Sequence, residues 1–355
     1  MKICFLSKDY SYNGGGERML CNLANELSRF CNVTIVSFDF SEKKSIYKLN
    51  SEIGFIDAKI QRRRINFFTK FDYVKYIKTH SDFFDSFDFI IGVGIICNLV
   101  LSYCSPKLKA KTVGWEHFCY DGTPFYQKIL RRFLFKKLNQ IVILTNRDLE
   151  KYKKINQNTT VIYNFTNMEF RKTPEFLNRQ FLFVGRLSRQ KGFSDLCSII
   201  KRFCKINDDW NFRIIGNGEY KTDFEKFIKS ENLENRINWS LVSDDVQKEM
   251  ENSSCFFMTS NFEGLPMVLI EAGFCALPAI SYDIPTGPSD IILDSKSGFI
   301  VPLHNQKLFV ERMKEFANDF ELQQKLSYGA KAESKKFNKQ NILSQWKEVL
   351  KKCER

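Results

Sequence analysis

The chain has 355 residues, of which 43% are hydrophobic and 27% charged, and this balance excludes an intrinsically disordered protein. At about 150 residues per domain, the length favours two domains. The net charge of +13 is uneven: residues 1–165 contain 26 Lys and Arg against 15 Asp and Glu, a net +11, which leaves 28 against 26, a net +2, for residues 166–355. A basic half of this kind is typical of contact with an anionic surface, either nucleic acid or membrane.

The first half of the chain alternates strands with helices. A strand at residues 2–6 leads through the glycines of residues 14–16 into a helix at 17–29, and a second strand follows at 33–38. Continuous apolar runs predict further strands of the same parallel sheet, covered on both faces. These strands are expected at residues 89–92, 111–114 and 140–144.

The same pattern restarts near residue 164. Strands are predicted at residues 181–185, 212–216, 237–241, 255–259 and 279–281, and helices at 193–203, 221–229 and 340–352. Two α/β units in tandem predict a cleft in which a ligand meets the carboxyl ends of parallel strands.

Neither a targeting segment nor a metal site is indicated. The apolar run at residues 3–6 is too short for a signal peptide, and the longest apolar stretch, residues 89–100, is shorter than the ~20 residues of a membrane-spanning helix. The eleven cysteines form no C-x-x-C pair, and only three histidines are present. We therefore expect a cytoplasmic protein whose reduced cysteines fill small apolar sites.

The most specific motif lies in residues 261–272, where Glu263 and Glu271 are eight residues apart with a proline between them. A helix beginning near Leu265 would turn its N-terminal N–H groups toward an anionic ligand. At about 1.5 Å per residue the carboxylates lie roughly 10 Å apart, too far for the acid pair of a retaining glycoside hydrolase, which needs about 5 Å. The spacing suits two carboxylates that bind hydroxyls at opposite ends of one ligand. Taken alone, it is also compatible with a solvated Glu263 and an ordinary helical Glu271.

A second motif, residues 184–192, follows a predicted strand and precedes a predicted helix. Gly185 permits close approach of the backbone, and Arg186 and Lys191 can reach the same point from the strand end and the helix start. Two cationic groups there would stabilise a departing diphosphate, although a basic turn would explain the same residues.

Together with the turn at residues 14–18 and the later Leu277-Pro278, these motifs resemble the family-4 glycosyltransferases, which are retaining nucleotide-sugar enzymes. The four motifs occur in order over nearly the whole chain, which makes the resemblance specific. It implies the α/β fold called GT-B, with two Rossmann-like domains facing across a cleft. The implied domains are an acceptor-binding domain at 1–165, a nucleotide-sugar-binding domain at 166–338, and a helix at 339–355 that returns to the first domain.

The resemblance also implies roles for individual residues. Arg186 and Lys191 would bind the donor diphosphate, while Glu263 and His117 would contact the donor sugar, so these four are the expected catalytic residues. The further donor-binding residues are Gly15, Gly16, Gly185, Leu241, Val242, Gly264, Leu265, Pro266, Met267 and Glu271. Among them Glu271 would hold the ribose, and the base would lie near residues 241–242 and near the Gly-Asn-Gly of residues 216–218. Glu116, beside the histidine, is a weaker candidate for orienting the acceptor.

Two positions depart from the family pattern. Ala276 stands where many relatives have Gly before Leu-Pro, which puts the local turn geometry in question, and Asp290 stands where relatives commonly have Glu. GT-B enzymes need no D-x-D ion site, so the resemblance implies no metal and no cofactor. It implies a nucleotide-sugar substrate, which we expect to be UDP-linked.

Basic clusters in the first half mix Lys and Arg with Phe and Leu. The candidates for contact with an acceptor or a membrane are Arg62, Arg63, Arg64, Arg131, Arg132, Lys136 and Lys137. This composition is typical of a segment that lies on anionic lipid. A basic solvated face over buried Phe is the alternative, and nucleic acid is disfavoured because no RNP-type, helix-turn-helix or zinc motif is present. The resemblance gives the membrane a reason, since family members that build bacterial glycans use acceptors on undecaprenyl diphosphate.

We therefore expect a retaining transferase that moves a hexose or N-acetylhexosamine from a nucleotide sugar to a lipid-linked glycan. It would act peripherally at the inner face of the cytoplasmic membrane, in the synthesis of a bacterial surface polysaccharide such as O-antigen or of a glycoprotein glycan. The alternatives are a GDP-mannose-dependent mannosyltransferase and a non-catalytic glycan- or lipid-binding scaffold with the same fold. No signature indicates an epimerase or a phosphorylase.

Overall fold

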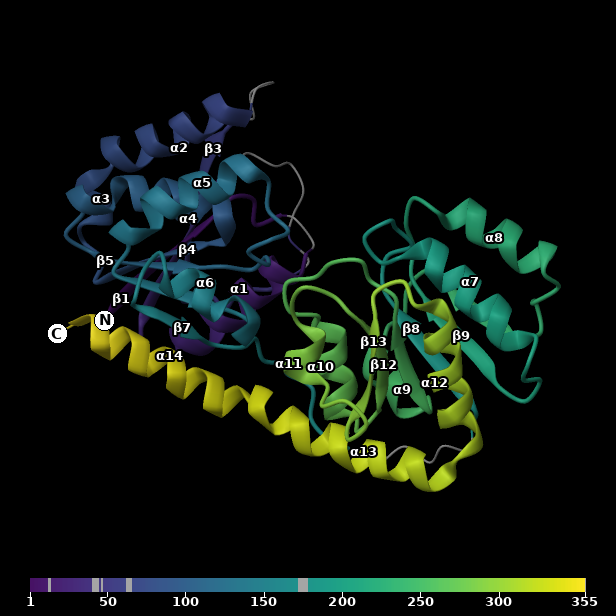
Figure 1. Cartoon of the computed structure of the whole chain (residues 1–355). Coiled ribbons are helices and arrows are strands. Elements are labelled where there is room, and N and C mark those ends of the chain that lie inside the picture. The colour runs from purple at the N-terminus through teal and green to yellow at the C-terminus, as the bar shows by residue number, and fades with distance from the viewer. Residues whose placement is uncertain (12–13, 40–44, 46, 62–65, 172–177, 355) are drawn as a thin grey trace. The chain divides into compact units, whose positions relative to one another are not determined.

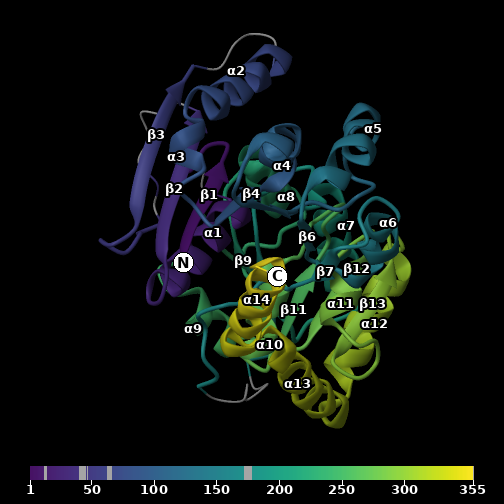
Figure 2. The same ribbon diagram turned by 90° about the vertical axis from the view of Figure 1, so that its left-hand side faces the viewer.

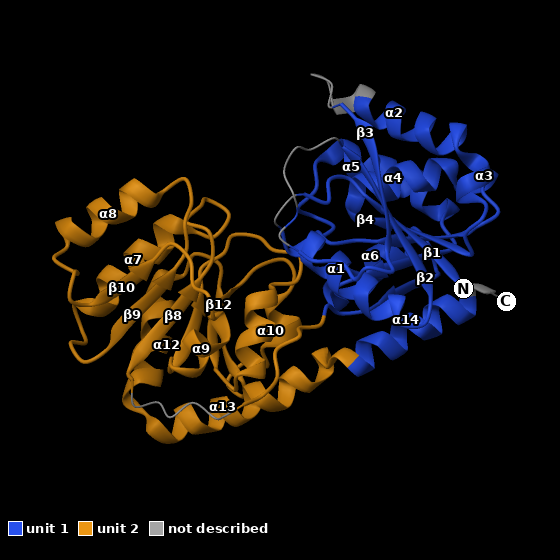
Figure 3. Cartoon of the chain, turned by 180° about the vertical axis from the view of Figure 1, so that it is seen from behind, with its two compact units in different colours: residues 1–164, 340–355 blue, residues 165–339 orange. Residues whose placement is uncertain are grey.

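The chain forms two compact units, each built on one parallel sheet (Figure 1). The computed structural model describes residues 1–11, 14–39, 45, 47–61, 66–171 and 178–354. Unit 1 comprises residues 1–164 and 340–355, and unit 2 comprises residues 165–339 (Figure 3). The α/β class expected from the sequence is confirmed, since every strand pair in the described residues is parallel.

Unit 1 contains a seven-stranded sheet in the order β3-β2-β1-β4-β5-β6-β7, and Figure 2 shows β3, β2 and β1 side by side. The strands are β1 (Lys2–Ser7), β2 (Asn32–Asp39), β3 (Gly54–Ile60), β4 (Phe89–Val93), β5 (Lys111–Trp115), β6 (Gln140–Ile143) and β7 (Thr159–Val161). The helices are α1 (Gly15–Ser28), α2 (Asn66–Thr79), α3 (Ser81–Phe84), α4 (Gly94–Cys104), α5 (Phe125–Leu134), α6 (Leu149–Lys153) and α14 (Lys339–Glu354). Helices α2 and α4 cover one face of the sheet, and α1 and α14 the other (Figures 1 and 3).

Unit 2 contains a six-stranded sheet in the order β10-β9-β8-β11-β12-β13. The strands are β8 (Gln180–Val184), β9 (Asn211–Ile215), β10 (Ile237–Ser240), β11 (Cys255–Met258), β12 (Ala279–Asp283) and β13 (Gly298–Pro302). The helices are α7 (Phe193–Cys204), α8 (Lys221–Ser230), α9 (Val246–Glu251), α10 (Met267–Phe274), α11 (Pro288–Ile291), α12 (Gln306–Asn318) and α13 (Phe320–Ser334).

Both sheets have the doubly wound strand order, in which the chain reverses direction across the sheet after its third strand. The reversal lies between β1 and β4 in unit 1 and between β8 and β11 in unit 2. Ligands of open parallel sheets bind outside the carboxyl ends of the strands at this point. The strand order therefore indicates candidate ligand sites at the loops after β1 and β4 in unit 1 and after β8 and β11 in unit 2.

Helix α14 completes the core of unit 1, although it follows unit 2 in the chain. Its buried face includes Ile342, Trp346 and Leu350, each at most 1% exposed. The Trp346 ring meets Trp115, the last residue of β5, edge to face with the ring centroids 5.2 Å apart. The last helix of the chain thus supports the carboxyl end of β5 in unit 1.

The turn after α10 keeps the geometry of a glycine turn without a glycine. Ala276 has φ +53°, the left-handed conformation that Gly usually supplies after a helix. Its N–H bonds to the Gly273 carbonyl at 3.0 Å, and the next N–H, of Leu277, bonds to the Ala272 carbonyl at 2.9 Å. These two bonds form a Schellman motif, so the departure at Ala276 leaves the turn in place.

Candidate active site

Two loops of unit 2, residues 185–192 after β8 and residues 259–266 after β11, are bonded to each other. Thr259 Oγ1 donates to the Lys191 carbonyl at 2.9 Å, and Asn261 Nδ2 donates to the Arg189 carbonyl at 2.6 Å. Because β8 and β11 are adjacent parallel strands, their carboxyl ends meet at one edge of the sheet. Two sequence motifs about seventy residues apart therefore form one site.

The predicted residues Lys191 and Glu263 form an ion pair in this site. The distance from Lys191 Nζ to Glu263 Oε1 is 2.6 Å, and the two side chains are 20% and 12% exposed. An ammonium and a carboxylate are thus held at one point, partly shielded from water yet open to a ligand. The cation suits a phosphate oxygen and the carboxylate suits a sugar hydroxyl.

Gly192, which the sequence analysis did not single out as a site residue, is the glycine this loop requires. It has φ +69°, and a Cβ built there would lie 1.9 Å from the Thr259 carbonyl oxygen. At Gly185 the atoms nearest to a Cβ would be those of the Lys191 side chain at 3.4 Å and of the Phe183 ring at 3.5 Å, which is ordinary van der Waals contact. The signal for Gly192 was its position directly before the helix, where a left-handed residue ends the turn.

A third loop, residues 284–287, supports the site from the side of β12. Thr286 Oγ1 donates to the Glu263 carbonyl at 2.8 Å. Gly287, with φ +105°, packs so closely that a Cβ would lie 2.3 Å from Pro266 Cδ. These contacts fix the backbone that carries Glu263.

The other predicted residues of unit 2 differ in exposure. Arg186 is exposed, and among the described residues it has no hydrogen-bonding or ionic partner. Glu271 is 4% exposed within α10, which begins at Met267 rather than near Leu265 as expected. The side chains of Leu265, Pro266 and Met267 are buried, whereas Gly264 is partly exposed. Leu241 and Val242 are 37% and 75% exposed in the loop after β10.

In unit 1, the structure brings Gly16 and His117 together. A Cβ built on Gly16 would lie 3.8 Å from the His117 ring, while Gly15, the first residue of α1, faces open space. The His117 ring also rests on Trp115, with the ring centroids 4.3 Å apart. This places an imidazole beside a helix N-terminus, a position that suits an anionic or hydroxyl-bearing ligand.

His117 is uncharged at neutral pH. Its ring is partly buried, its Nε2 is enclosed without a partner among the described residues, and burial lowers its pKa to about 3. A neutral ring nitrogen can still exchange one hydrogen bond with a hydroxyl group.

The structure corrects the prediction that Arg131 contacts an acceptor or a membrane. Its side chain is fully buried, and Nη2 lies 3.1 Å from Glu116 Oε2. Tyr152 Oη donates to the same carboxylate at 2.8 Å and Asn98 Nδ2 at 2.5 Å, so Glu116 is also unsuited to orienting an acceptor. The physical reason is helical periodicity, since Arg131 lies on the inward face of α5 and its charge is compensated there.

The remaining basic candidates lie at the surface or outside the described residues. Arg132, Lys136 and Lys137 are exposed. Arg62, Arg63 and Arg64 lie outside the described residues. The outward face of α5 exposes Phe125, Ile129 and Phe133, which follow one another at intervals of four residues and are 78%, 42% and 60% exposed. This apolar stripe, called the α5 face below, was not separated from its inward neighbours by the sequence analysis.

Unit 1 also contains a cavity of about 320 Å³ near the carboxyl ends of β1 and β2 and beside the first half of β3. Its lining residues are Asp9, Tyr10, Ser11, Ser37, Asp39, Ser45, Tyr47, Leu49, Phe55 and Asp57. Carboxylates repel phosphate, whereas carboxylates with hydroxyls and aromatic rings suit the hydroxyls and faces of a sugar. This cavity was not predicted from the sequence, because its residues come from the loop after β1, from β2, from the segment between β2 and β3 and from β3 itself.

Within the described ranges, no three His, Cys, Asp or Glu side chains are grouped so that they could hold a metal ion. The expectation of metal-independent chemistry stays a prediction. Of the helices in those ranges, none combines the length and the apolar character that crossing a bilayer requires.

Comparisons with known proteins agree with the architecture. Residues 166–333 match the family model described as glycosyl transferases group 1. The chain is 27% identical to the amylovoran biosynthesis glycosyltransferase AmsD of Erwinia amylovora, over 98% of this chain and 99% of that protein. It is 25% identical to a Campylobacter jejuni protein named as a GalNAc-α-(1→4)-GalNAc-α-(1→3)-diNAcBac-PP-undecaprenol α-1,4-N-acetyl-D-galactosaminyltransferase, over 99% of this chain and 98% of that one.

Among solved structures, HepE from Anabaena, determined in complex with UDP, superposes with a TM-score of 0.81. The match covers 99% of this chain and all of HepE at 16% identity, so it bears on the fold alone. The two parallel sheets and their neighbours identify the fold as GT-B, as expected.

Proposed function

We propose that the chain is a retaining glycosyltransferase that uses a nucleotide sugar, because residues 166–333 match the family model described as glycosyl transferases group 1. The observation that carries this proposal is the Lys191–Glu263 pair at the carboxyl ends of β8 and β11. It offers a cation for the diphosphate and a carboxylate for the sugar at the point where doubly wound sheets bind ligands.

In the proposed reaction the donor is held mainly by unit 2. Arg186 and Lys191 bind the diphosphate and stabilise it as it leaves, Glu263 accepts hydrogen bonds from the donor sugar, and Glu271 holds the ribose. In unit 1, Gly15 and Gly16 are assigned to the diphosphate and His117 to the donor sugar. The acceptor hydroxyl attacks on the face that the nucleoside diphosphate leaves, so the anomeric configuration is retained. The donor is a UDP-linked hexose or N-acetylhexosamine, and no metal takes part.

The proposed acceptor is a glycan on undecaprenyl diphosphate. The name of the Campylobacter relative, which covers nearly the whole chain, includes such an acceptor. We assign the terminal acceptor sugar to the cavity of unit 1, whose carboxylates and rings suit a neutral sugar. The bacterial process is the synthesis of a surface polysaccharide or a lipid-linked glycan precursor.

We further propose that the α5 face rests on the cytoplasmic membrane. Exposed Phe and Ile side chains insert at the boundary of the bilayer, and Arg132, Lys136 and Lys137 lie near anionic headgroups. Each such cation contributes about 1 kcal/mol, so several together hold a peripheral protein beside its lipid-linked acceptor.

The decisive experiment is thermal stabilisation across a panel of UDP-, GDP- and ADP-sugars. A ligand at 100 times its Kd stabilises the protein by about 2.7 kcal/mol, and we expect this from UDP-sugars. Stabilisation by GDP-mannose instead would favour a mannosyltransferase. A flat response to the entire panel would contradict the proposal.

A non-catalytic scaffold with the same fold is separated by its products. The enzyme releases a nucleoside diphosphate from its donor, by transfer or slow hydrolysis, whereas a scaffold binds the donor without consuming it. Release of UDP, measured by chromatography, distinguishes the two.

A further inference from the structure

The loop after β10 contains two exposed apolar residues, Leu241 and Val242, whose positions are not fixed by burial. Val242 is 75% exposed and Leu241 37%, so neither side chain is fixed by packing in the core. A loop of this kind needs other contacts if its backbone is to keep one geometry. Those contacts come from an ion pair between Arg213 of β9 and Glu249 of α9.

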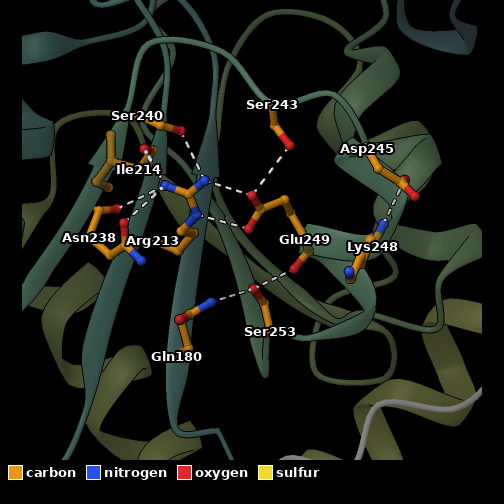
Figure 4. Close-up of polar contacts among 10 residues, drawn as sticks. All are labelled: Gln180, Arg213, Ile214, Asn238, Ser240, Ser243, Asp245, Lys248, Glu249 and Ser253. Carbon is orange, nitrogen blue, oxygen red and sulfur yellow. Dashed lines mark hydrogen bonds and ion pairs between the residues drawn. The ribbon is translucent and has the colours of Figure 1, made fainter.

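Arg213 and Glu249 form a bidentate pair inside unit 2 (Figure 4). Arg213 Nε lies 2.8 Å from Glu249 Oε2, and Nη2 lies 2.6 Å from Oε1. The two side chains are only 11% and 24% exposed, and the guanidinium lowers the pKa of Glu249. Planar two-point contacts between guanidinium and carboxylate are the strongest and most directional ion pairs in proteins.

This pair is bonded to the loop on both sides of residues 241–242. Arg213 Nη2 donates to Ser240 Oγ at 2.9 Å, on the strand side. Ser243 Oγ donates to Glu249 Oε1 at 3.3 Å, on the side that leads into α9. Figure 4 shows both serines turned toward the ion pair from opposite ends of the loop. The pair therefore joins the two ends of the loop through its own fixed geometry.

The pair is itself anchored to the sheet. Arg213 Nη1 donates to the side-chain and main-chain oxygens of Asn238, both at 3.3 Å. Behind Glu249, Ser253 Oγ donates to the Glu249 carbonyl at 2.8 Å and accepts from Gln180 Nε2 of β8 at 3.1 Å. The loop cannot shift unless these contacts shift with it. A pair that only joined β9 to α9 would not require the two serines.

We propose that Arg213 and Glu249 are positioning residues that hold the backbone of residues 240–243 to receive the base of a nucleoside diphosphate. The inference rests on the proposed function and on the expectation from the sequence that Leu241 and Val242 lie near the donor base. The backbone N–H and carbonyl groups of a fixed loop can pair with the edge of a base, whereas a loop that moves loses this selectivity.

The test removes the two ties and leaves the ion pair intact. The double variant Ser240→Ala/Ser243→Ala keeps Arg213 and Glu249 paired, so the fold is retained, and its melting temperature without ligand checks this. Ser230→Ala is the matched control, because within the described part of the chain Ser230 Oγ makes one hydrogen bond, to the Phe227 carbonyl at the end of α8. Binding of UDP, GDP and inorganic pyrophosphate is measured by calorimetry.

We expect the double variant to bind UDP about tenfold more weakly, as two lost hydrogen bonds of ~0.5–1.5 kcal/mol each imply, and to distinguish UDP from GDP less well. Its affinity for pyrophosphate, which has no base, should equal that of the wild type and of Ser230→Ala. Unchanged UDP affinity, or an equal loss for pyrophosphate, would overturn the positioning role while leaving the proposed function standing. If the wild type itself binds no nucleoside diphosphate, the proposed function fails first.

Discussion

Lys191 and Glu263 form one side-chain contact that offers binding groups for two parts of a nucleotide-sugar donor. The ammonium and the carboxylate are 2.6 Å apart and partly shielded from water, which strengthens each as a binding group. A bound donor would offer a diphosphate to the first and a sugar hydroxyl to the second. Arg186 precedes Lys191 in the same loop, is exposed, and has no hydrogen-bonding or ionic partner among the described residues. It can therefore bind the diphosphate as a second cation without first breaking a contact.

We predict that Lys191→Ala and Arg186→Ala each lower kcat by about 10²–10³-fold, since each removes a group that stabilises the leaving diphosphate. Arg189→Ala, another exposed cation of the same loop, is the control and should stay within a few-fold of the wild type. Steady-state kinetics of sugar transfer provide the measurement. Near-normal turnover of the first two variants, or an equal loss in the third, would rule out this assignment.

His117 should make the stability of unit 1 sensitive to acid. Its pKa is about 3 in the folded protein, against about 6.5 when unfolded, so the unfolded state binds the proton more readily. Stability is then complete above pH 6.5 and is lost as the pH falls from about 6.5 toward 3, by at most about 1.4 kcal/mol per pH unit.

Urea unfolding at pH 7 and pH 5 measures this effect. We expect His117→Gln to lose less stability than the wild type between these two values. Equal losses in the two proteins would show that the ring is not held neutral. Because the ring stays neutral above about pH 4, His117 should also contribute no step to the pH profile of activity between pH 5 and 9.

The sequence predicted which loops of unit 2 come together better than it predicted which charges lie inside. The two motifs were visible because each follows an apolar strand and precedes a helix, and the sheet then brings Lys191 and Glu263 together. Arg131 was placed at the surface because composition does not show which face of a helix is buried. Its ionic partner Glu116 follows β5, and the Tyr152 and Asn98 side chains that donate to Glu116 come from α6 and α4, so only the tertiary structure brings these groups together.

At the scale of single elements, the α5 face makes membrane binding testable. We predict that Phe125→Ser/Phe133→Ser reduces binding to anionic vesicles by at least about tenfold, because burying a Phe contributes roughly 1.5–3 kcal/mol. Tyr328→Ser, which removes an aromatic ring that is 67% exposed in unit 2, is the control. Vesicle sedimentation at low and high salt gives the measurement. Vesicle binding that is unchanged both by these substitutions and by the salt concentration would contradict a role for the α5 face.

The turn after α10 gives a prediction about backbone conformation. Ala276→Val should destabilise unit 2 by more than about 1 kcal/mol, because a β-branched residue adopts positive φ poorly. Ala276→Gly should change stability by less than about 1 kcal/mol, since relief of the left-handed conformation offsets the loss of one buried methyl group. Denaturant unfolding measures both. A Val variant as stable as the wild type would show that the turn is not constrained.

Elements with long apolar runs were the ones that could be predicted. Strands such as β4 and β11 are continuous hydrophobic segments and lie where expected. Strand β3 was missed because it is an edge strand whose sequence, Gly-Phe-Ile-Asp-Ala-Lys-Ile, alternates only weakly. Helix α5 was interpreted as a basic interfacial segment because its sequence mixes Lys and Arg with Phe, Ile and Leu. In such cases tertiary packing, rather than the local sequence, determines which residues form a strand and which face of a helix is buried.

At the scale of the whole chain, the charge asymmetry is an expected source of membrane affinity. One of the cations counted in residues 1–165, Arg131, is compensated by Glu116 in the interior and contributes nothing at the surface. The exposed cations beside the α5 face remain, and their attraction to anionic lipid falls off within a Debye length of about 8 Å at physiological salt. Charge thus favours association, and the apolar side chains of α5 decide which surface faces the bilayer.

Helix α14 is predicted to stabilise unit 1 specifically. Trp346→Ala should lower the stability of unit 1 by about 3–5 kcal/mol, because it removes a large ring that packs on Trp115. Lys347→Ala, an exposed neighbour whose ammonium lies over the Phe30 ring, should cost less than about 1 kcal/mol. Hydrogen exchange resolved by unit is the measurement. Equal loss of protection in both units, or none in unit 1, would contradict the prediction.

The position of α14 has a consequence for the order of biosynthesis. A ribosome makes residues 1–164, then all of unit 2, and only then the helix that covers Trp115. At 5–20 residues per second, roughly ten to thirty seconds pass during which the nascent first unit lacks this cover. Its sheet can form in that time, but α14, which packs on Trp115 two residues before His117, is synthesised last. The newly made chain therefore acquires a finished first unit only after its second unit has been translated.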